Sequence, residues 1–496
     1  MNAPANIEQA LKNLRFPDKA IIAGRSVDAA SGETFDCVSP VDGRVLARIP
    51  ACGAEDVDRA VKAARAAFDN GVWSAIAPRQ RKKVLQRFAR LIREHGEELA
   101  LLETLDMGKP IAEARSIDVA GTVHCLTWFA ESCDKIYDEL APVGPGAVGM
   151  ITREPIGVVA AVVPWNYPML MASWKLGPAL AAGNSVILKP AEQSPLSAIR
   201  LGELAREAGL PDGVLQVLPG FGETAGQALG RHMDVDMVAF TGSTEVGRYF
   251  LRYAGESNMK HVSLECGGKS PNIVFADAGD LDEAAKQAAL GVFHNAGQVC
   301  TAATRLLVEE KIHDAFLERV VAIGRKMQPK NPLDDKARLG AVVDATQLDR
   351  ILDYVEVGRK EGASLVLGGE RVMADTGGVY MPPTIFDRVD NKMRIAQEEI
   401  FGPVISTITF REPDEALRIA NDTIYGLAAS VWTNDINKAH RLARGLRAGK
   451  VCINNVDGGD ITLPFGGYKQ SGIGRDNSLH AYDKYTQLKT TYIALS

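Results

Sequence analysis

Cys300 is the first side chain in the sequence whose surroundings suggest chemistry. It follows the string Asn295-Ala-Gly-Gln-Val and precedes Thr301 and two alanines. Most free cysteines are small buried hydrophobic residues, but a cysteine that ionises is a strong nucleophile. We interpret Cys300 as a candidate nucleophile and Cys266 as a packing residue.

Glu265 is a candidate general base. It ends the β-rich run His261–Glu265 and is followed by the turn Cys266-Gly-Gly-Lys. A carboxylate at such a place can accept a proton from a reacting group, or it can bond only to nearby backbone amides. The residues alone leave both interpretations open.

Asn166 is a candidate donor to a developing negative charge. It lies in an aromatic-Asn-aromatic segment that Pro164 and Pro168 bracket. Proline fixes φ and removes a backbone donor, so the segment is rigid and can hold the amide in one direction, as an oxyanion donor requires. The alternative is a buried turn in which Asn166 only satisfies the backbone.

Two glycine-rich segments are candidates for binding a dinucleotide. Gly242 and Ser243 follow a β-rich run and open a helix, where unpaired backbone N–H groups can meet a pyrophosphate. The segment from Gly220 through Gly222 to Gly226 is a weaker signal, because its last glycine comes one residue later than in the usual fingerprint.

Short apolar runs separated by helices must position these groups. Residues 78–108 show the apolar spacing of amphipathic helices, and residues 196–208 and 223–229 are also expected to be helical. Runs that are apolar on both faces are typical of a parallel sheet covered by helices. We expect two such α/β series, the first with strands near 157–163, 185–190, 214–220, 237–240 and 261–265, and the second with strands near 272–275, 306–310, 364–369, 404–410, 427–434 and 451–455.

Two further segments, 146–153 and 484–495, alternate polar and apolar residues and lie outside both series. We interpret them as an arm that pairs with another subunit. A small local hairpin is the alternative.

The composition excludes several classes of protein. A net charge of −6 argues against a nucleic-acid partner. Met1–Arg15 lacks the apolar core of a signal peptide, and the longest apolar stretch, Gly157–Val163, is far short of the ~20 residues that span a bilayer. The seven cysteines form no CxxC pair, which favours a reducing cytoplasm and gives no metal-ligand spacing. We expect a cytoplasmic protein with no metal site and no membrane segment.

Seven ordered motifs resemble those of the aldehyde dehydrogenase superfamily, and the resemblance extends over nearly the whole chain. It is strongest toward bacterial dehydrogenases of γ-glutamyl-γ-aminobutyraldehyde and other ω-aminoaldehydes. The motifs are PWNYP from Pro164, KPAEQSP from Lys189, FTGSTEVG from Phe240, LECGGKSP from Leu264, GQVC from Gly297, EEIFGP from Glu398 and PFGGYKQSGIGRD from Pro464.

This resemblance implies an α/β fold with a Rossmann-like NAD-binding domain, an α/β catalytic domain and a small β oligomerisation arm. The NAD-binding domain would comprise residues 1–140 and 160–266, the catalytic domain 267–481, and the arm 141–159 and 482–496. A homo-oligomer, either a dimer or a tetramer, is implied as well.

The resemblance also assigns roles to residues. Cys300 would be the nucleophile that forms a thiohemiacetal and a thioester, Glu265 the general base, and Asn166 the oxyanion donor together with the backbone N–H of the cysteine. A carboxylate at Glu192 favours NAD over NADP, although NADP remains possible. The implied cofactor-binding residues are Trp165, Lys189, Glu192, Gly222, Gly242, Ser243, Gly247, Glu399 and Phe401.

The substrate is expected to be a small aldehyde, an ω-amino-, guanidino- or γ-glutamylamino-butyraldehyde of polyamine or arginine catabolism. Asp457 and Asp460 would suit a cationic tail at the entrance, or they could only form a turn. The expected apolar walls are Trp128, Tyr167, Trp174 and Phe465. A broad-specificity or betaine-aldehyde-type dehydrogenase is the alternative.

Within the family, Glu265 favours a hydrolytic, non-acylating enzyme, because the members that acylate coenzyme A lack this glutamate. A cysteine-dependent hydrolase without nicotinamide is a hypothesis of another class, but no histidine stands in these motifs to activate the cysteine. A structural protein that keeps only the fold is disfavoured by the intact Cys300, Glu265 and Asn166.

Overall fold

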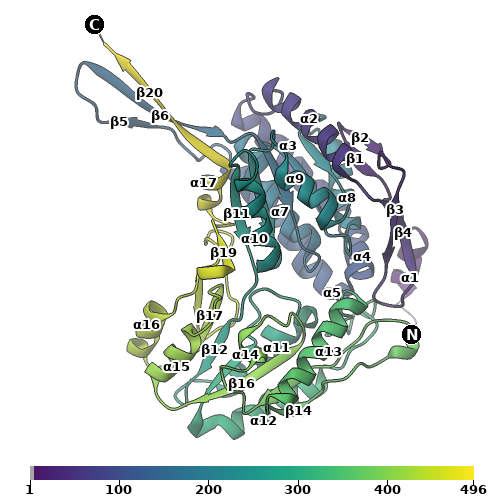
Figure 1. The fold of residues 1–496 in the computed structure, drawn as a ribbon, viewed down its shortest axis with the longest axis vertical. Coiled ribbons are helices and arrows are strands. Elements are labelled where there is room, and N and C mark those ends of the chain that lie inside the picture. Colours follow the sequence, from purple (N-terminus) through teal and green to yellow (C-terminus); the bar gives the residue numbers. More distant parts are fainter. Residues whose placement is uncertain (1–4, 496) are drawn as a thin grey trace.

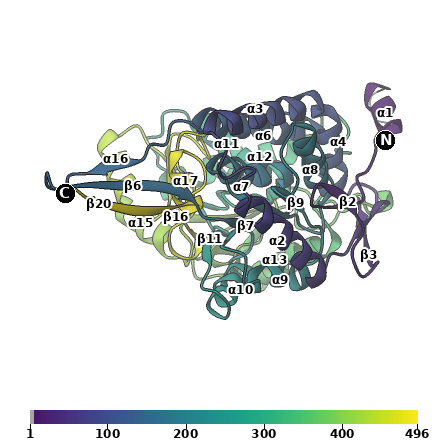
Figure 2. The ribbon, with the colours of Figure 1, turned by 90° about the horizontal axis from the view of Figure 1, so that it is seen from above.

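The structure, a computed structural model, describes residues 5–495. Met1–Pro4, at the start of the expected NAD-binding domain, and Ser496, at the end of the expected arm, lie outside the described residues. It has two α/β parts and a projecting three-stranded sheet (Figure 1). The first and last described elements, α1 (Ala5–Lys12) and β20 (Thr486–Ala494), lie at opposite ends of the molecule (Figure 2). None of the helices in this described part of the chain is long and apolar enough to cross a membrane.

The first part is built on an eight-stranded sheet of order β19-β11-β10-β7-β8-β9-β1-β2. Its five central strands are parallel, and every residue of β7, β8 and β10 is buried. The strands are β19 (Gly472–Ile473), β11 (His261–Glu265), β10 (Met237–Thr241), β7 (Val158–Val162), β8 (Ser185–Lys189), β9 (Leu215–Val217), β1 (Ala20–Ile22) and β2 (Arg25–Val27).

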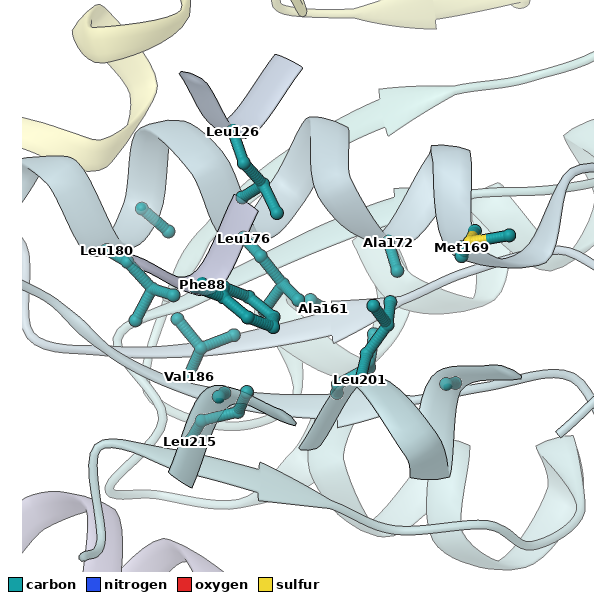
Figure 3. Packing of buried hydrophobic residues seen from close by; sticks show 14 of the residues in the cluster. Phe88, Leu126, Ala161, Met169, Ala172, Leu176, Leu180, Val186, Leu201 and Leu215 are labelled. Carbon is teal, nitrogen blue, oxygen red and sulfur yellow. The ribbon is translucent and has the colours of Figure 1, made fainter. Parts of the chain in front are cut away.

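Helices cover both faces of this sheet because alternate residues of each strand point to opposite sides. In β7, Val159 and Ala161 enter one core cluster, whereas Val158 and Ala160 enter another. Figure 3 shows the first cluster, in which Phe88 packs near Leu176 and Val186. One face is covered by α3 (Pro78–Glu94), α4 (Gly96–Met107), α6 (Ala120–Ser132), α7 (Pro168–Ala182) and α8 (Leu196–Glu207), and the other by α2 (Ala54–Asp69), α9 (Gln227–Arg231) and α10 (Thr244–Gly255).

The second part has a seven-stranded sheet of order β14-β15-β16-β13-β12-β17-β18, parallel except for β14. Its strands are β14 (Ser364–Leu367), β15 (Thr384–Asp387), β16 (Val404–Phe410), β13 (Arg305–Glu309), β12 (Pro271–Val274), β17 (Ala428–Trp432) and β18 (Lys450–Ile453). Its main helices are α11 (Leu281–Phe293), α12 (His313–Lys326), α13 (Ala345–Lys360), α15 (Pro413–Asn421) and α16 (Ile436–Gly445).

The projecting sheet contains β5 (Glu139–Ala141), β6 (Ala147–Pro155) and β20 (Thr486–Ala494), which is preceded by the short helix α17 (Tyr482–Tyr485). The strands β6 and β20 pair antiparallel along their full length, and both extend away from the body (Figure 1). Leu488 is 60% exposed and Tyr492 66% exposed. The expected alternating segments therefore form strands that pair with each other, and their pairing with a second subunit stays a prediction.

The division into domains also stays a prediction, but one strand crosses its proposed boundary. β19, which falls within the expected catalytic range 267–481, pairs with β11 at the edge of the first sheet. The sequence analysis also did not anticipate β1, β2 or the hairpin of β3 (Thr34–Val38) and β4 (Val45–Pro50).

Candidate active site

A cavity of about 610 Å³ brings most of the predicted site residues together. Its wall includes the loop after β7, the ends of β10 and β11, and the turn before β13. The predicted residues on this wall are Cys300, Glu265, Asn166, Trp165, Gly242, Ser243, Glu399, Phe401, Tyr167, Trp174, Asp457, Asp460 and Phe465.

Cys300 follows a left-handed stretch of backbone. Asn295, Ala296 and Gly297 have φ values of 46°, 52° and 72°, and a non-glycine residue in this region costs about 1–3 kcal/mol. The side chain of Gln298 holds the turn, since its Nε2 donates to the Asn295 oxygen at 3.0 Å and its Oε1 accepts from the Val343 N–H at 2.9 Å. The packing around these residues thus fixes the position of the thiol.

The pKa of the Cys300 thiol is raised. Loss of contact with water is the main cause, although the residue is only partly buried, and the carboxylates of Asp457, Glu399 and Glu265 raise the pKa further. Because the thiolate is the nucleophilic form, the thiol must lose its proton when a ligand reacts.

Asn166 is buried and firmly held. Its side-chain Nδ2 donates to the backbone carbonyl of Gln298 at 2.8 Å. Its backbone carbonyl accepts from Asn295 Nδ2 at 2.9 Å. An amide nitrogen carries two N–H groups, so one remains for a negative oxygen in the cavity beside Cys300.

Glu265 ends β11 with both carboxylate oxygens buried and without a hydrogen-bond partner among the described residues. Gly466 lies against it, because a Cβ at position 466 would stand 2.8 Å from Oε1. Burial and the nearby Asp476 carboxylate raise the pKa of Glu265, whereas Lys175, Lys484 and Arg475 lower it. A carboxylate with a raised pKa and free lone pairs is suited to accept a proton near neutral pH.

Another part of the cavity wall has donors for an anionic ligand. α10 begins there, and Ser243 caps it by accepting from the Val246 N–H at 3.2 Å. The first N–H groups of a helix are free of intrahelical partners and attract phosphate. Nearby, burial raises the pKa of Glu399 to about 7, and its Oε1 accepts from the Gly268 N–H at 3.0 Å.

These residues fit a nicotinamide dinucleotide. The hydroxyl of Thr241, on the cavity wall, is buried without a hydrogen-bond partner in the described structure, which suits a polar group of a ligand. The rings of Trp165 and Phe401 meet edge to face at 5.2 Å. At the end of β8, Lys189 Nζ lies 3.4 Å from Glu192 Oε2, outside the wall of this cavity.

The predicted substrate residues fall into two groups. Trp174 and Phe465 form an edge-to-face aromatic wall at 5.0 Å. Asp457 is already paired, because its carboxylate accepts from Lys450 Nζ at 2.6 Å and from the Thr301 hydroxyl at 3.0 Å. Asp460 accepts from the Thr462 N–H at 2.9 Å, as in turn chemistry.

Five predicted residues do not line the cavity: Trp128, Lys189, Glu192, Gly222 and Gly247. The Trp128 ring meets Phe129 edge to face at 4.9 Å. A Cβ at Gly247 would lie 2.9 Å from Cys266 Sγ, so this glycine permits the close packing of α10 against the sheet. Gly222 begins the short helical turn Gly222–Gly226.

Several residues of the site were missed by the sequence analysis. Gln347 Nε2 donates to the Phe401 carbonyl at 2.9 Å and so holds the loop that carries Glu399. Lys175, Asp476 and Lys484 form a buried charged group near Glu265. The available signal was Lys175 itself, the one charged residue in the otherwise apolar segment 168–182.

Comparisons with known proteins found similar sequences and structures. The family model described as "Aldehyde dehydrogenase family" matches residues 27–491. The "NADP/NAD-dependent aldehyde dehydrogenase PuuC" of Escherichia coli K12 is 52% identical over 97% of each chain.

Two solved structures are also similar. An indole-3-acetaldehyde dehydrogenase in complex with NAD+ has 57% identity and a TM-score of 0.98, and the match covers 100% of both chains. A γ-glutamyl-γ-aminobutyraldehyde dehydrogenase from Burkholderia cenocepacia J2315 has the same identity, TM-score and coverage. NAD and NADP are therefore the cofactors of this chain's relatives, as expected from the sequence.

These matches correct one expectation. The description of the enzyme as hydrolytic and non-acylating is wrong, because the findings support NAD(P)-dependent aldehyde oxidation by an acylating mechanism. The physical reason is that an aldehyde oxidised while attached to a cysteine sulfur leaves an acyl group on the protein. The presence of Glu265 does not exclude such a mechanism.

Proposed function

The chain belongs to the aldehyde dehydrogenase family, and from this premise we propose that it oxidises its aldehyde through a thiohemiacetal and a thioester on Cys300. NAD(P)-dependent aldehyde oxidation is the activity of the family and its relatives. The observation that carries the proposed mechanism is that Cys300, Glu265 and Asn166 line one cavity, which also reaches the start of α10.

In the first step the Cys300 sulfur adds to the aldehyde carbon, the thiol proton is released to solvent, and a negative charge develops on the aldehyde oxygen. Asn166 Nδ2 and the Cys300 backbone N–H stabilise that charge. Donors that are already oriented before the reaction are typically worth about 3–4 kcal/mol each. When bound, the nicotinamide supplies the two-electron oxidation that turns the thiohemiacetal into the thioester.

In the second step an oxygen nucleophile that carries a proton adds to the thioester carbon and loses that proton to Glu265. The new C–O bond replaces the C–S bond, so the acyl group leaves at the oxidation level of a carboxylic acid and the Cys300 sulfur leaves as a thiolate. The Cys300 thiol takes up a proton in turn, which its raised pKa favours.

The test of this mechanism uses Glu265→Gln, which keeps the shape of the side chain but removes its basicity. We expect a burst of NADH approaching one per site, then a steady rate lower by ~10²–10⁴-fold, with the acyl group found by mass spectrometry on the peptide that contains Cys300. An adduct on Cys266, or no adduct at all, would contradict the thioester. If the burst itself slows, Glu265 also governs the first step.

For the substrate we propose an ω-amino-, guanidino- or γ-glutamylamino-butyraldehyde. The name of one relative, a γ-glutamyl-γ-aminobutyraldehyde dehydrogenase, supports this choice, and another is named for a shorter amino aldehyde, aminoacetaldehyde. The exposed carboxylate of Asp460 at the cavity also supports it. The Lys450–Asp457 pair and the Trp174–Phe465 wall favour a second candidate, broad specificity that includes aromatic aldehydes.

Aldehydes of equal length with cationic, neutral and anionic ends, and one aryl aldehyde, distinguish these candidates. NADH formation gives kcat/KM for each. A clear preference for the cationic end, lost in Asp460→Asn, supports the first candidate. Equal values for the cationic and neutral aldehydes, with a higher value for the aryl aldehyde, would replace it by the second.

We also propose that the protein is a cytoplasmic homo-oligomer, either a dimer or a tetramer, whose contacts include the projecting sheet. All seven cysteines are free, which suits a reducing compartment. The exposed Leu488 and Tyr492 on β20 suit a contact with another copy.

A further inference from the structure

A buried group of three charged residues lies behind Glu265. Asp476 is fully buried and accepts one lysine on each oxygen: Lys175 Nζ contacts Oδ2, and Lys484 Nζ contacts Oδ1 at 2.5 Å. Lys484 Nζ is also 3.3 Å from the Ser263 hydroxyl, two residues before Glu265 on β11. Lys484 therefore bridges Asp476 and the strand that carries the candidate base.

The three residues come from distant parts of the chain. Lys175 lies on α7, and Asp476 is held by paired backbone hydrogen bonds to Phe465 of the cavity wall, at 2.7 and 2.8 Å. Lys484 lies on α17, which leads directly into β20 of the projecting sheet. The next residue, Tyr485, accepts from the Ile156 N–H at 3.2 Å and from Asn184 Nδ2 at 3.0 Å. The base of the projecting sheet is thus fixed against both β6 and the body.

The charges determine what Lys484 contributes. The charged groups that act on Glu265 are Asp476, Lys175, Lys484 and Arg475, and Cys266, Cys300 and Tyr485 are the other titratable groups beside it. Asp476 stays ionised, because the two lysines lower its pKa although burial acts to raise it. Lys175 alone balances the Asp476 charge, so Lys484 is the additional cation that favours an ionised Glu265.

We infer that Lys484 is a positioning residue that sets the pH range in which Glu265 accepts a proton. It lies on α17, where the projecting sheet joins the body. The inference rests on the proposed role of Glu265 as the base. It requires that Lys484 keep Asp476 in place and supply positive charge near Glu265, both of which its contacts allow.

The direction of the effect follows from the sign of the charges. Glu265 accepts a proton only when it is ionised, so a step that uses it slows as the pH falls through the pKa of Glu265. The acidic limb of the pH–rate profile is the range in which the rate falls as Glu265 takes up a proton. Lys484→Met removes a cation and moves this limb to higher pH, by on the order of one unit. Asp476→Asn removes an anion and moves the limb to lower pH. A loss of stability alone would not move the limb in opposite directions in Lys484→Met and Asp476→Asn.

The experiment measures the pH dependence of NADH formation, as both burst and steady rate, in the full-length protein. Lys484→Arg keeps the charge and the donors and should restore the wild-type limb. Lys489→Met is the matched control, since Lys489 is an exposed lysine of the same projecting sheet, paired with Glu154 at 2.5 Å. Light scattering and thermal unfolding record whether each variant folds and assembles.

The outcomes separate this inference from the proposed function. If the limb persists in Glu265→Gln, it does not belong to Glu265 and the proposed base is wrong. If the limb disappears in Glu265→Gln but stays at its wild-type pH in both Lys484→Met and Asp476→Asn, the inference alone fails. Should Lys484→Met not fold, an unshifted limb in Asp476→Asn still overturns the inference.

Discussion

At the scale of single residues, Cys300 and Cys266 show that a raised pKa alone does not identify a nucleophile. Both thiols have raised pKa values, although Cys266 is buried and Cys300 is partly exposed. Cys300 differs because it shares a cavity with the Asn166 amide, which is bonded to the carbonyl of Gln298, two residues before Cys300. Cys266 instead packs so close to α10 that position 247 has no room for a side chain.

Replacing each cysteine in turn tests this distinction. Cys300→Ala should abolish aldehyde oxidation while NAD+ binding, measured by calorimetry, stays close to the wild-type affinity, because the start of α10 is unchanged. Cys266→Ala should keep its activity and lose about 1–2 kcal/mol of stability from lost packing. Appreciable turnover by Cys300→Ala would remove the thiol from the mechanism.

The sequence allowed prediction of the catalytic candidates but not of the residues that tune them. Cys300, Glu265 and Asn166 each lie in a local pattern of turns and strand ends. Lys175 and Asp476 are 301 residues apart, so nothing local indicates that they meet. Only the folded chain brings such charges together, and a buried lysine in an apolar helix indicates a partner without naming it.

At the scale of secondary structure, the long buried strands were predictable and the short ones were not. β7, β8 and β10 are apolar on both faces, which the sequence displays directly. β1, β2 and β19 have two or three residues each. Such short strands depend on pairing with a neighbour, because so few side chains show no period.

Glu192, just after the end of β8, is the residue from which we predict the choice of cofactor. Glu192→Gln should weaken NAD+ binding and improve NADP+ relative to NAD+, because the change removes an acceptor for the ribose hydroxyl and a negative charge that repels a 2′-phosphate. The ratio of kcat/KM for the two cofactors measures this. A wild-type protein that already prefers NADP+ would show that Glu192 does not control the choice.

At the scale of the whole molecule, the sheet of β5, β6 and β20 projects away from the body (Figure 1). Truncation after Thr486 keeps Lys484 and removes β20, so it tests assembly separately from the charges behind Glu265. We expect a lower mass by light scattering, because β20 carries exposed apolar side chains such as Leu488 and Tyr492. An unchanged mass would place the subunit contacts elsewhere.

The pairing of β6 with β20 also has a consequence for synthesis on the ribosome. Thr152 and Lys489 face each other in the sheet but are 337 residues apart in the chain. At typical elongation rates the partner strand emerges between about 17 and 70 s after β6. During that time β5 can cover one edge of β6, and the other edge stays open to pairing with any neighbouring nascent chain. A chaperone that binds β6 before β20 is made would therefore protect this protein from aggregation while it is being translated.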